Sequence, residues 1–439
     1  MTRRVAVTGL GVVDPFEGLV PVEPSGDADA TGAPPAPENL SAPQRFFDRV
    51  AAGCSASRLY VTEGIEPVIS LPAVRCADFS AEARFGRALA GMMERFAQLG
   101  FAAARDAWVD AGLNQPANAV DPAIAGVCWG TALGGLLAFE RGYRDFWQHG
   151  RRVAPMSVVL GMNNAATAHI SIQLGLGNSA LTYSVACASA ACAIGEAFRH
   201  IRAGHAQLMV AGGSDATLAH GVLKAWEALK VLARSDAASA PHACRPFHPQ
   251  RAGLVLGEGA AALVLEDWDR AVRRGATIYA EVAGYGANAD HSHLVRPSEA
   301  GQFAALQAAL GDAGLQAADI GYVNAHGTAT REGDPVEIAA LRKLFGPHAA
   351  ALPVSATKAA HGHMMGATGA VEALLTVLAL HTDVLPPTAH LDAVDPACAG
   401  VRHIQGSALR GTGARAALSN SFAFGGSNAV LAFKTARRR

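Results

Sequence analysis

The stretch that decides the fold is residues 181–204, LTYSVACASAACAIGEAFRHIRAG. Its first six residues are typical of a short buried strand, and the residues after Cys187 carry Ile194, Phe198 and Ile201 on one helical face. Cys187 therefore lies at a junction between a strand and a helix. The first-turn amides and the helix dipole at such a junction favour a thiolate, which makes Cys187 a candidate nucleophile. An Ala-rich junction also tolerates an inert buried cysteine, so this segment alone leaves both interpretations open.

Outward from this junction, strands and helices alternate along the chain, as α/β folds require. The hydrophobic patterns predict strands at 4–13, 124–129, 278–286 and 321–324, and helices at 87–110, 302–313 and 370–381. The two halves look alike in architecture, although no residue-level repeat proves a duplication. We therefore expect an N-terminal half at 1–275 and a C-terminal half at 276–439, with a Pro-rich surface insertion at about 21–43.

Composition narrows the class of protein. The chain has 439 residues, of which 50% are hydrophobic and 17% charged, so it can bury an extensive core. Its net charge of −1 lacks the basic surplus of a nucleic-acid-binding domain. We see neither a signal peptide nor an uninterrupted apolar stretch of membrane-spanning length, and therefore expect a soluble cytoplasmic protein without membrane contact. Seven widely spaced cysteines without a CxxC pair indicate neither a zinc site nor a disulfide framework.

A second chemical motif is VNAHGTAT at residues 323–330. His326 follows a predicted strand, and strand ends are where α/β folds expose functional groups. A lone histidine in a glycine-containing turn is more often a hydrogen-bonded structural group than a catalyst. Downstream, Asp334 and Glu337 could orient this histidine or a nearby cation, or could simply stabilise the start of the next helix.

The third motif, SATKAAHGHMMGATGA at residues 355–370, contains Lys358, His361 and His363. Two histidines two residues apart could indicate a metal site, but no carboxylate or cysteine lies at a supporting spacing, so we predict no metal here. A neutral imidazole can instead donate a hydrogen bond to a developing enolate oxygen. A neighbouring lysine can fix the protonation state of such a pair.

Taken together, VACASA, NAHGTAT and SATKxxxGH, closed by NSFAFGGSN at residues 420–428, occur in the order found in one family. The chain resembles the beta-ketoacyl-acyl-carrier-protein synthase II family over nearly its whole length. This resemblance implies a duplicated thiolase-like α/β fold with five αβαβα layers. It also implies an acyltransferase that joins an acyl-enzyme thioester to malonyl-carrier protein by decarboxylative Claisen condensation, in fatty-acid or type II polyketide chain elongation.

The resemblance also implies roles for individual residues. Cys187 would be the acylated nucleophile, assisted by the pair His326 and His363 and by two supporting charged residues, Lys358 and Glu337. Backbone amides of Cys187 and Phe424 would form the oxyanion hole, with Phe424 as the gate of the acyl pocket. The remaining implied contacts bind the substrate or its carrier: Thr328 and Thr330 at the phosphopantetheine arm, Leu133 and Trp226 at the acyl chain, Asp290 and His293 in a loop that moves with the gate, and Lys230 at the carrier protein.

Departures from the family pattern leave carrier and chain specificity open. Trp226 stands where a smaller phenylalanine is expected, His361 where threonine is more usual, and Gly91 and Met92 where basic docking residues are expected. No bound cofactor is implied, because the acyl carrier protein delivers substrate on its phosphopantetheine arm. The chain would form a homodimer or a heterodimer with a homologous chain-length-factor subunit.

Two alternatives to a chain-elongating synthase remain. One is a specialised polyene or secondary-metabolite ketosynthase that works with a chain-length-factor partner. The other is a non-catalytic partner subunit. Such subunits lack the nucleophile, so the intact Cys187, His326 and His363 argue against the second alternative.

Overall fold

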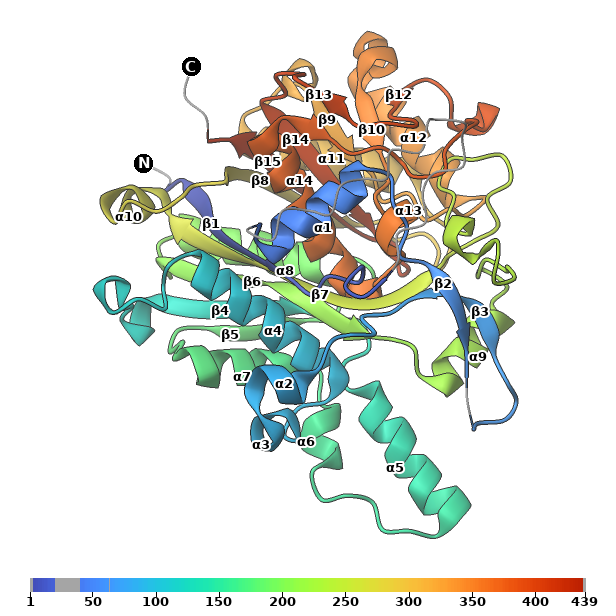
Figure 1. Ribbon diagram of the computed structural model, residues 1–439. Coiled ribbons are helices and arrows are strands. Elements are labelled where there is room, and N and C mark those ends of the chain that lie inside the picture. Colours follow the sequence, from blue (N-terminus) through green and yellow to red (C-terminus); the bar gives the residue numbers. More distant parts are fainter. Residues whose placement is uncertain (1–2, 20–39, 63, 437–439) are drawn as a thin grey trace.

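The computed structural model describes residues 3–19, 40–62 and 64–436 (Figure 1). Most of the Pro-rich segment predicted at 21–43 lies outside these residues. Its end belongs to a helix rather than to the expected surface excursion, because α1 (Ala42–Ala51) already begins at Ala42. Proline is tolerated in the first helical turn, where its missing N–H would have no helical partner, and Pro43 is buried there.

Thirteen strands of the described chain form one hydrogen-bonded sheet, whose long path runs β12-β10-β9-β14-β15-β8-β1-β7-β6-β4-β5. The N-terminal strands on this path are β1 (Val5–Val12), β4 (Ala125–Gly130), β5 (Ala180–Tyr183), β6 (Leu208–Ala216) and β7 (Leu256–Asp267). The C-terminal strands are β8 (Ala280–Ala289), β9 (Tyr322–Asn324), β10 (Pro353–Ser355), β12 (Arg402–His403), β14 (Ala416–Phe422) and β15 (Ser427–Thr435).

The two halves of this sheet repeat one topology. Five strands of each half, numbered in chain order, lie in the order 1-5-4-2-3, which is β1-β7-β6-β4-β5 in one half and β8-β15-β14-β9-β10 in the other. The first two pairings are antiparallel and the next two parallel in both halves. Antiparallel pairing of β1 with β8 joins the halves. This repeat confirms the duplicated fold, which the residue sequence alone did not prove.

Helices complete five layers (Figure 1). In the N-terminal half α4 packs on β1, β6 and β7, while α7 packs on β4 and β5. In the C-terminal half α11 packs on β8 and β15, and α12 packs on α11. Between the two halves, α8 contacts β4 and β6, α14 contacts β14 and β15, and the two helices contact each other. These layer-forming helices are α4 (Arg95–Asp110), α7 (Ala165–Leu174), α8 (Ser189–Arg202), α11 (Glu299–Ala313), α12 (Gly333–Phe345) and α14 (Thr368–Thr382).

The central helix corrects one expectation. Residues Met365–Thr382 form an 18-residue run that is long and apolar enough to cross a membrane, although we predicted no stretch of that length. Because α14 is covered on all sides by other layers, 89% of this run is buried inside the protein. A helix that is apolar all round is typical of such a central position, so the run is accounted for as a core helix.

Smaller elements surround these layers. The helix predicted at 87–110 is two helices, because the chain breaks before Glu94, whose side chain accepts a hydrogen bond from the Phe96 amide at 3.1 Å and caps α4. The other helices are α2 (Ala81–Phe85), α3 (Arg87–Ala90), α5 (Leu136–His149), α6 (Ser157–Gly161), α9 (His220–Ala228), α10 (Trp268–Arg273) and α13 (Lys358–His361). The other strands are β2 (Arg58–Val61), β3 (Ser70–Val74), β11 (Val384–Leu385) and β13 (Leu409–Arg410).

Candidate active site

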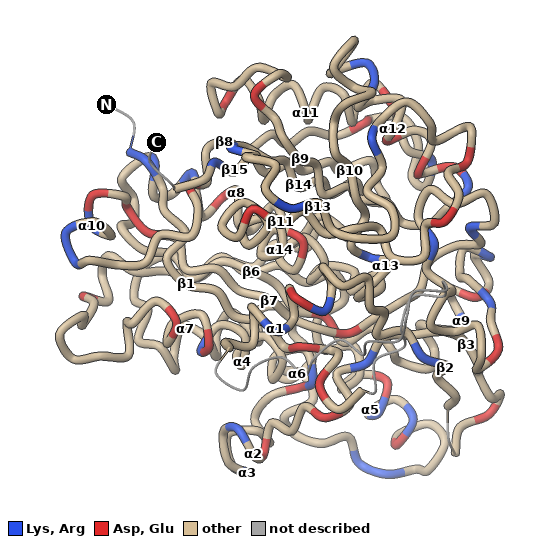
Figure 2. Tube along the Cα trace, turned by 45° about the horizontal axis from the view of Figure 1, so that its top comes forward, with Lys and Arg blue, Asp and Glu red and all other residues tan. Residues whose placement is uncertain are grey.

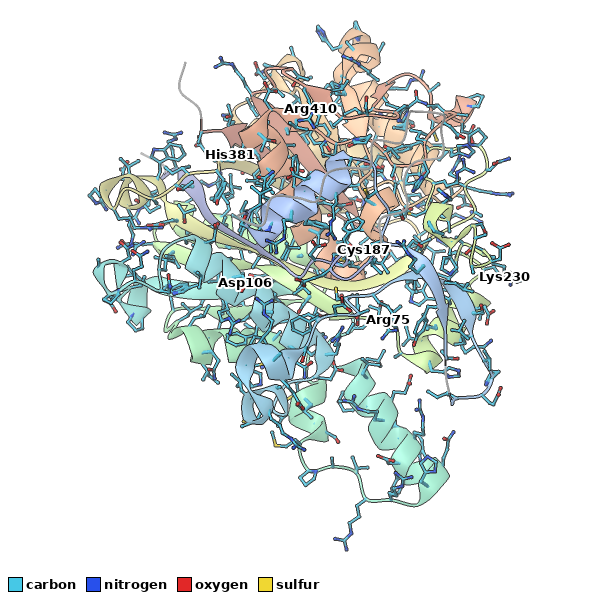
Figure 3. The ribbon with its side chains drawn as sticks, in the orientation of Figure 1. Arg75, Asp106, Cys187, Lys230, His381 and Arg410 are labelled. Carbon is cyan, nitrogen blue, oxygen red and sulfur yellow. The ribbon has the colours of Figure 1, made fainter. Side chains whose placement is uncertain are left out.

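Cys187 lies in the turn between β5 and α8, near the middle of the molecule (Figure 3). Ala186, just before it, has a φ of 46°, in the left-handed region that non-glycine residues seldom adopt. Ser189 fixes this turn, because its hydroxyl donates to the Ala186 carbonyl at 2.6 Å and accepts from the Val185 amide at 2.9 Å. The sequence of small residues thus forms a tight turn that directs the thiol into the cavity described below.

The surroundings of the thiol oppose ionisation. Cys187 is only 6% exposed, and burial raises its pKa to about 11, against the opposite effects of the Lys358 ammonium and the backbone amides of Phe424 and Cys187. The sequence led us to expect that the start of the helix favours the thiolate; the nearby amides do lower this pKa, but burial outweighs them. A neutral thiol needs a base before it can attack. The two amides next to the sulfur are the pair predicted for the oxyanion hole.

His363 is the base within reach of this thiol. Its Nε2 lies 3.1 Å from the Cys187 sulfur, and its Nδ1 lies 2.9 Å from the hydroxyl oxygen of Thr368. His326 stands beside it, with ring centroids 5.6 Å apart and nearly perpendicular planes. Burial and the nearby Lys358 charge lower the pKa of both histidines well below the usual value. Both imidazoles are therefore neutral at pH 7.

Lys358 fixes the proton on one of these imidazoles. Its Nζ lies 3.2 Å from Nδ1 of His326, contacts the His326 carbonyl, and donates to Oε1 of Glu372 at 2.6 Å. An ammonium group can only donate, so Nδ1 of His326 accepts and Nε2 carries the ring proton. Lys358 and Glu372 are both fully buried. Burial raises the pKa of Glu372, and the adjacent Lys358 counteracts that rise.

We did not predict Glu372 or Thr368 from the sequence. A signal for Glu372 was present, because it is the one acidic residue in the apolar run GAVEALLTVLAL at 369–380. A buried carboxylate in such a run requires a partner. Thr368 gave no comparable signal, since a threonine near a helix start is common.

Glu337 supports the site through the backbone. Its carboxylate accepts from the amides of His326 and Gly327, both at 2.8 Å, and from the side chain of Asn420 at 3.0 Å. It thus holds the turn that carries His326. The carboxylate that pairs with Lys358 is that of Glu372.

A cavity of about 660 Å³ opens beside the cysteine. Ten of the predicted site residues line it, namely Cys187, Trp226, Lys230, Asp290, His326, Thr328, Thr330, Glu337, His363 and Phe424. Lys358 lies behind His326, outside this lining. Leu133 and His293 do not line the cavity either. The backbone amide of Leu133 donates to the carboxylate of Asp215 at 3.2 Å. The assignment of the Leu133 side chain to the acyl pocket stays a prediction.

The wall of the cavity has a stacked aromatic pair and a hydrogen-bonded loop. The rings of Trp226 and Phe424 lie 5.9 Å apart at 24°. Behind Phe424, the Asp290 amide donates to the Gly426 carbonyl, and the Gly425 amide donates to the Leu294 carbonyl, both at 2.7 Å. These bonds connect the 290–294 loop to the segment that carries the predicted gate.

His293 and the two threonines have local hydrogen bonds. The exposed His293 accepts from the amides of Val295 and Arg296, both at 3.1 Å, and so shapes its loop. The hydroxyls of Thr328 and Thr330 lie 3.1 Å apart on the cavity wall. Two hydroxyls there can bind amide groups of an extended arm.

The cluster of Cys187, His326 and His363 also has the ligand types of a metal site. The sulfur of Cys187 and one ring nitrogen each of His326 and His363 lie within 4.8 Å of one another, a set that could hold a zinc-like ion. The Lys358 ammonium beside them opposes a cation. His361 takes no part, because its Nε2 faces the Thr357 hydroxyl at 3.2 Å and burial lowers its pKa to about 3. The predicted absence of a metal stays a prediction.

Comparisons with known proteins agree with this geometry. Residues 73–271 match the N-terminal domain of beta-ketoacyl synthases, and residues 279–392 match the C-terminal domain. The chain is 43% identical to nodulation protein E of Rhizobium meliloti over 78% of this chain and 82% of that protein. It is 39% identical to 3-oxoacyl-[acyl-carrier-protein] synthase 2 of Staphylococcus aureus strain COL over 98% of both.

Solved structures of beta-ketoacyl synthases have the same fold as this chain. A beta-ketoacyl synthase from Burkholderia phymatum STM815 superposes with a TM-score of 0.86 at 33% identity, covering 99% of this chain and 100% of that one. The ishigamide ketosynthase/chain length factor superposes with a TM-score of 0.85 at 29% identity over the whole of both chains. Fold and relatives define an acyltransferase of the condensing type, with a thiolase-like fold. The chain belongs to the beta-ketoacyl synthase family.

Proposed function

We propose that this protein extends acyl chains by decarboxylative Claisen condensation of an acyl-Cys187 thioester with malonyl-carrier protein, in fatty-acid or type II polyketide assembly. The observation that carries the proposal is the 3.1 Å contact between Cys187 and His363, with the lysine-bound His326 beside it on the wall of one cavity. The carrier's phosphopantetheine arm brings the substrate, and no resident cofactor is needed for these steps.

Acylation begins from a neutral thiol and a neutral imidazole. As the sulfur attacks the carrier thioester, its proton passes to Nε2 of His363. The amides of Cys187 and Phe424 donate to the carbonyl oxygen as it becomes negative. Collapse breaks the bond to the carrier sulfur, and His363 returns the proton to that leaving thiolate. The products are acyl-Cys187 and a free carrier thiol.

Condensation then uses both histidines as hydrogen-bond donors. The malonyl carboxylate leaves as carbon dioxide, and its electron pair forms an enolate whose oxygen accepts from Nε2–H of His326 and of His363. The enolate carbon attacks the acyl carbonyl, which forms the new carbon–carbon bond and expels the Cys187 thiolate. A proton from solvent restores the thiol.

The carrier is proposed to dock at the mouth of this cavity. Lys230, Arg296 and Arg331 line the mouth from three separate segments, are exposed, and have no ion-pair partner among the described residues. Glu332 is the acidic residue at the same rim. A phosphodiester at the base of the phosphopantetheine arm and an acidic carrier surface both complement this cationic rim. Elsewhere, charges of both signs are intermixed along the chain (Figure 2).

We also propose that the chain acts as a soluble cytoplasmic dimer. β5 is the terminal strand of the long sheet path, and α7 packs on it and α6 on α7. Apolar side chains stand exposed on these three elements: Val158, Val159, Ile172 and Leu181. An exposed sheet edge with an apolar surround favours pairing with another chain. The ishigamide ketosynthase, a structural relative, is paired with a chain length factor. A second copy or a homologous chain-length-factor subunit is therefore the proposed partner.

One experiment tests the reaction. Incubation with an acyl-carrier protein should add one acyl mass to the peptide that contains Cys187, and Cys187→Ala should abolish both this mass and condensation. An acyl mass on another peptide, or condensation by Cys187→Ala, would refute the mechanism. A panel of acyl primers, assayed with and without a co-purifying homologous subunit, separates chain elongation by this chain alone from the alternative of a specialised ketosynthase.

A further inference from the structure

The two active-site imidazoles have different partners behind them. Nδ1 of His326 faces the Lys358 ammonium, which can only donate a hydrogen bond. Nδ1 of His363 faces the Thr368 hydroxyl at 2.9 Å, which can both donate and accept. Thr368 is fully buried, and its hydroxyl oxygen has no other hydrogen-bond partner among the described residues. One ring is therefore fixed in a single tautomer, and the other is not.

We propose that Thr368 is a positioning residue that lets His363 serve as proton carrier in acylation and as hydrogen-bond donor in condensation. This inference rests on the proposed function. It assigns His326, by contrast, to hydrogen-bond donation alone, because its tautomer is set by Lys358.

Acylation requires an acceptor at Nδ1. When Nε2 of His363 receives the Cys187 proton, Nδ1 must already carry its own hydrogen, which the Thr368 oxygen accepts. The ring is then a cation, so this hydrogen bond becomes charge-assisted and about twice as strong as a neutral one. The Thr368 oxygen thus stabilises the state in which His363 holds the transferred proton.

Condensation requires the opposite arrangement. Nε2 must now carry the hydrogen that is donated to the enolate oxygen, so Nδ1 has a lone pair and the Thr368 hydroxyl turns to donate to it. The two neutral tautomers exchange protons with water that enters the open cavity between carrier visits. A hydroxyl satisfies both tautomers by rotation, which a methyl group cannot do.

The hydroxyl of Thr368 does not cap the helix. Thr368 is the first residue of α14, the N-cap is Ala367, and no side chain makes a capping hydrogen bond at this helix start. The contact with His363 is what the hydroxyl adds.

The test compares three variants. Thr368→Val replaces the hydroxyl by a methyl group, Thr368→Ser keeps the hydroxyl, and Thr376→Val removes the hydroxyl of another buried threonine in α14, which donates to the Glu372 carbonyl at 2.7 Å. Single-turnover acylation of Cys187 is followed by intact mass. Decarboxylation of malonyl-carrier protein is followed separately in a Cys187→Ala background, where no acylation occurs.

The two half-reactions should respond differently. Thr368→Val should slow acylation about 10- to 100-fold, since a buried nitrogen loses its partner as it becomes cationic. Decarboxylation should slow less than about fivefold, because His326 still donates. Thr368→Ser should stay within about threefold of wild type in both assays, and Thr376→Val should match wild type.

Three results would overturn the inference: wild-type acylation by Thr368→Val, no recovery in Thr368→Ser, or an equal loss in both half-reactions accompanied by a lower unfolding temperature. Failure of the proposed function is distinguishable, because the wild-type chain itself would then acquire no acyl mass at Cys187.

Discussion

The buried ion pair between Lys358 and Glu372 allows stability and catalysis to be tested apart. Both side chains are fully buried, and Nζ lies 2.6 Å from the carboxylate. Glu372→Ala leaves the ammonium with only the carbonyl and Nδ1 of His326. Breaking a buried pair from one side costs about 3–5 kcal/mol, because the remaining charge stays desolvated. We therefore expect the free energy of unfolding to fall by about that amount.

Removing both charges should restore much of the stability that Glu372→Ala loses, but should still slow decarboxylation. In the double variant Lys358→Met/Glu372→Leu no charge is left without a partner, and replacing a buried pair by apolar side chains is often neutral or stabilising. Its free energy of unfolding should exceed that of Glu372→Ala but stay about 1–3 kcal/mol below wild type, because the buried carbonyl and Nδ1 of His326 lose their donor. Decarboxylation should nevertheless fall about 10- to 100-fold, because His326 loses a hydrogen bond to a charged group that is worth about 1.5–3 kcal/mol.

Urea denaturation and malonyl-carrier decarboxylation measure these two effects. Glu299→Ala is the matched control, since it removes the acid of a half-exposed pair with Lys343 at 3.7 Å and should cost less than about 1 kcal/mol. The reasoning is refuted if Glu372→Ala unfolds at the wild-type urea concentration. It is also refuted if the double variant is less stable than Glu372→Ala, or if it decarboxylates at the wild-type rate.

Three further predictions follow from the site and its surroundings. Alkylation of Cys187 by iodoacetamide should rise about tenfold per pH unit between pH 7 and 9.5, because the thiolate is the nucleophile and the pKa of this thiol is raised to about 11; a plateau by pH 8 would contradict this. The pair of changes Arg296→Ala and Arg331→Ala should raise the KM for malonyl-carrier protein about tenfold, if each lost contact is worth about 0.7 kcal/mol. The KM for malonyl-pantetheine, which lacks the phosphate, should not change. The control variant Arg410→Ala should alter neither KM. An equal rise in KM for both substrates would argue against docking of the carrier at this rim. Finally, Val159→Asp should convert a dimer to monomers in sedimentation velocity, and a persistent dimer would place the interface elsewhere.

Local sequence patterns carried much of the fold. The helix after Cys187, the apolar strand after the N-terminus and the helix of residues 370–381 all follow from the hydrophobic pattern. The buried strand predicted at 181–186 is wrong in part: β5 ends at Tyr183 and is partly exposed, because it is the terminal strand of the long sheet path. The motifs around Cys187, His326 and His363 identified the family in advance, because their residue types and order are specific in combination.

The sequence could not report distances between segments. Cys187 and His363 are 176 residues apart in the chain and meet at 3.1 Å because one strand order is repeated in both halves. Glu372 stands out in the sequence as the one acid of an apolar run, but the sequence could not identify it as the partner of Lys358, because the two side chains meet only through the packing around α14. Leu133 and His293 do not line the cavity, so the acyl-pocket role of Leu133 and the role of His293 in a loop that moves with the gate stay predictions.

For Cys187, the sequence by itself determined that the thiol stands between a strand and a helix and that two histidine motifs accompany it. Only the tertiary structure decided its protonation state. Local sequence supplies the helix start, but burial depends on every layer packed around the turn, and desolvation here outweighs the stabilisation from nearby amides and from Lys358. The tertiary structure likewise placed Thr368 behind His363 and Lys358 behind His326, which gives two identical side chains different roles.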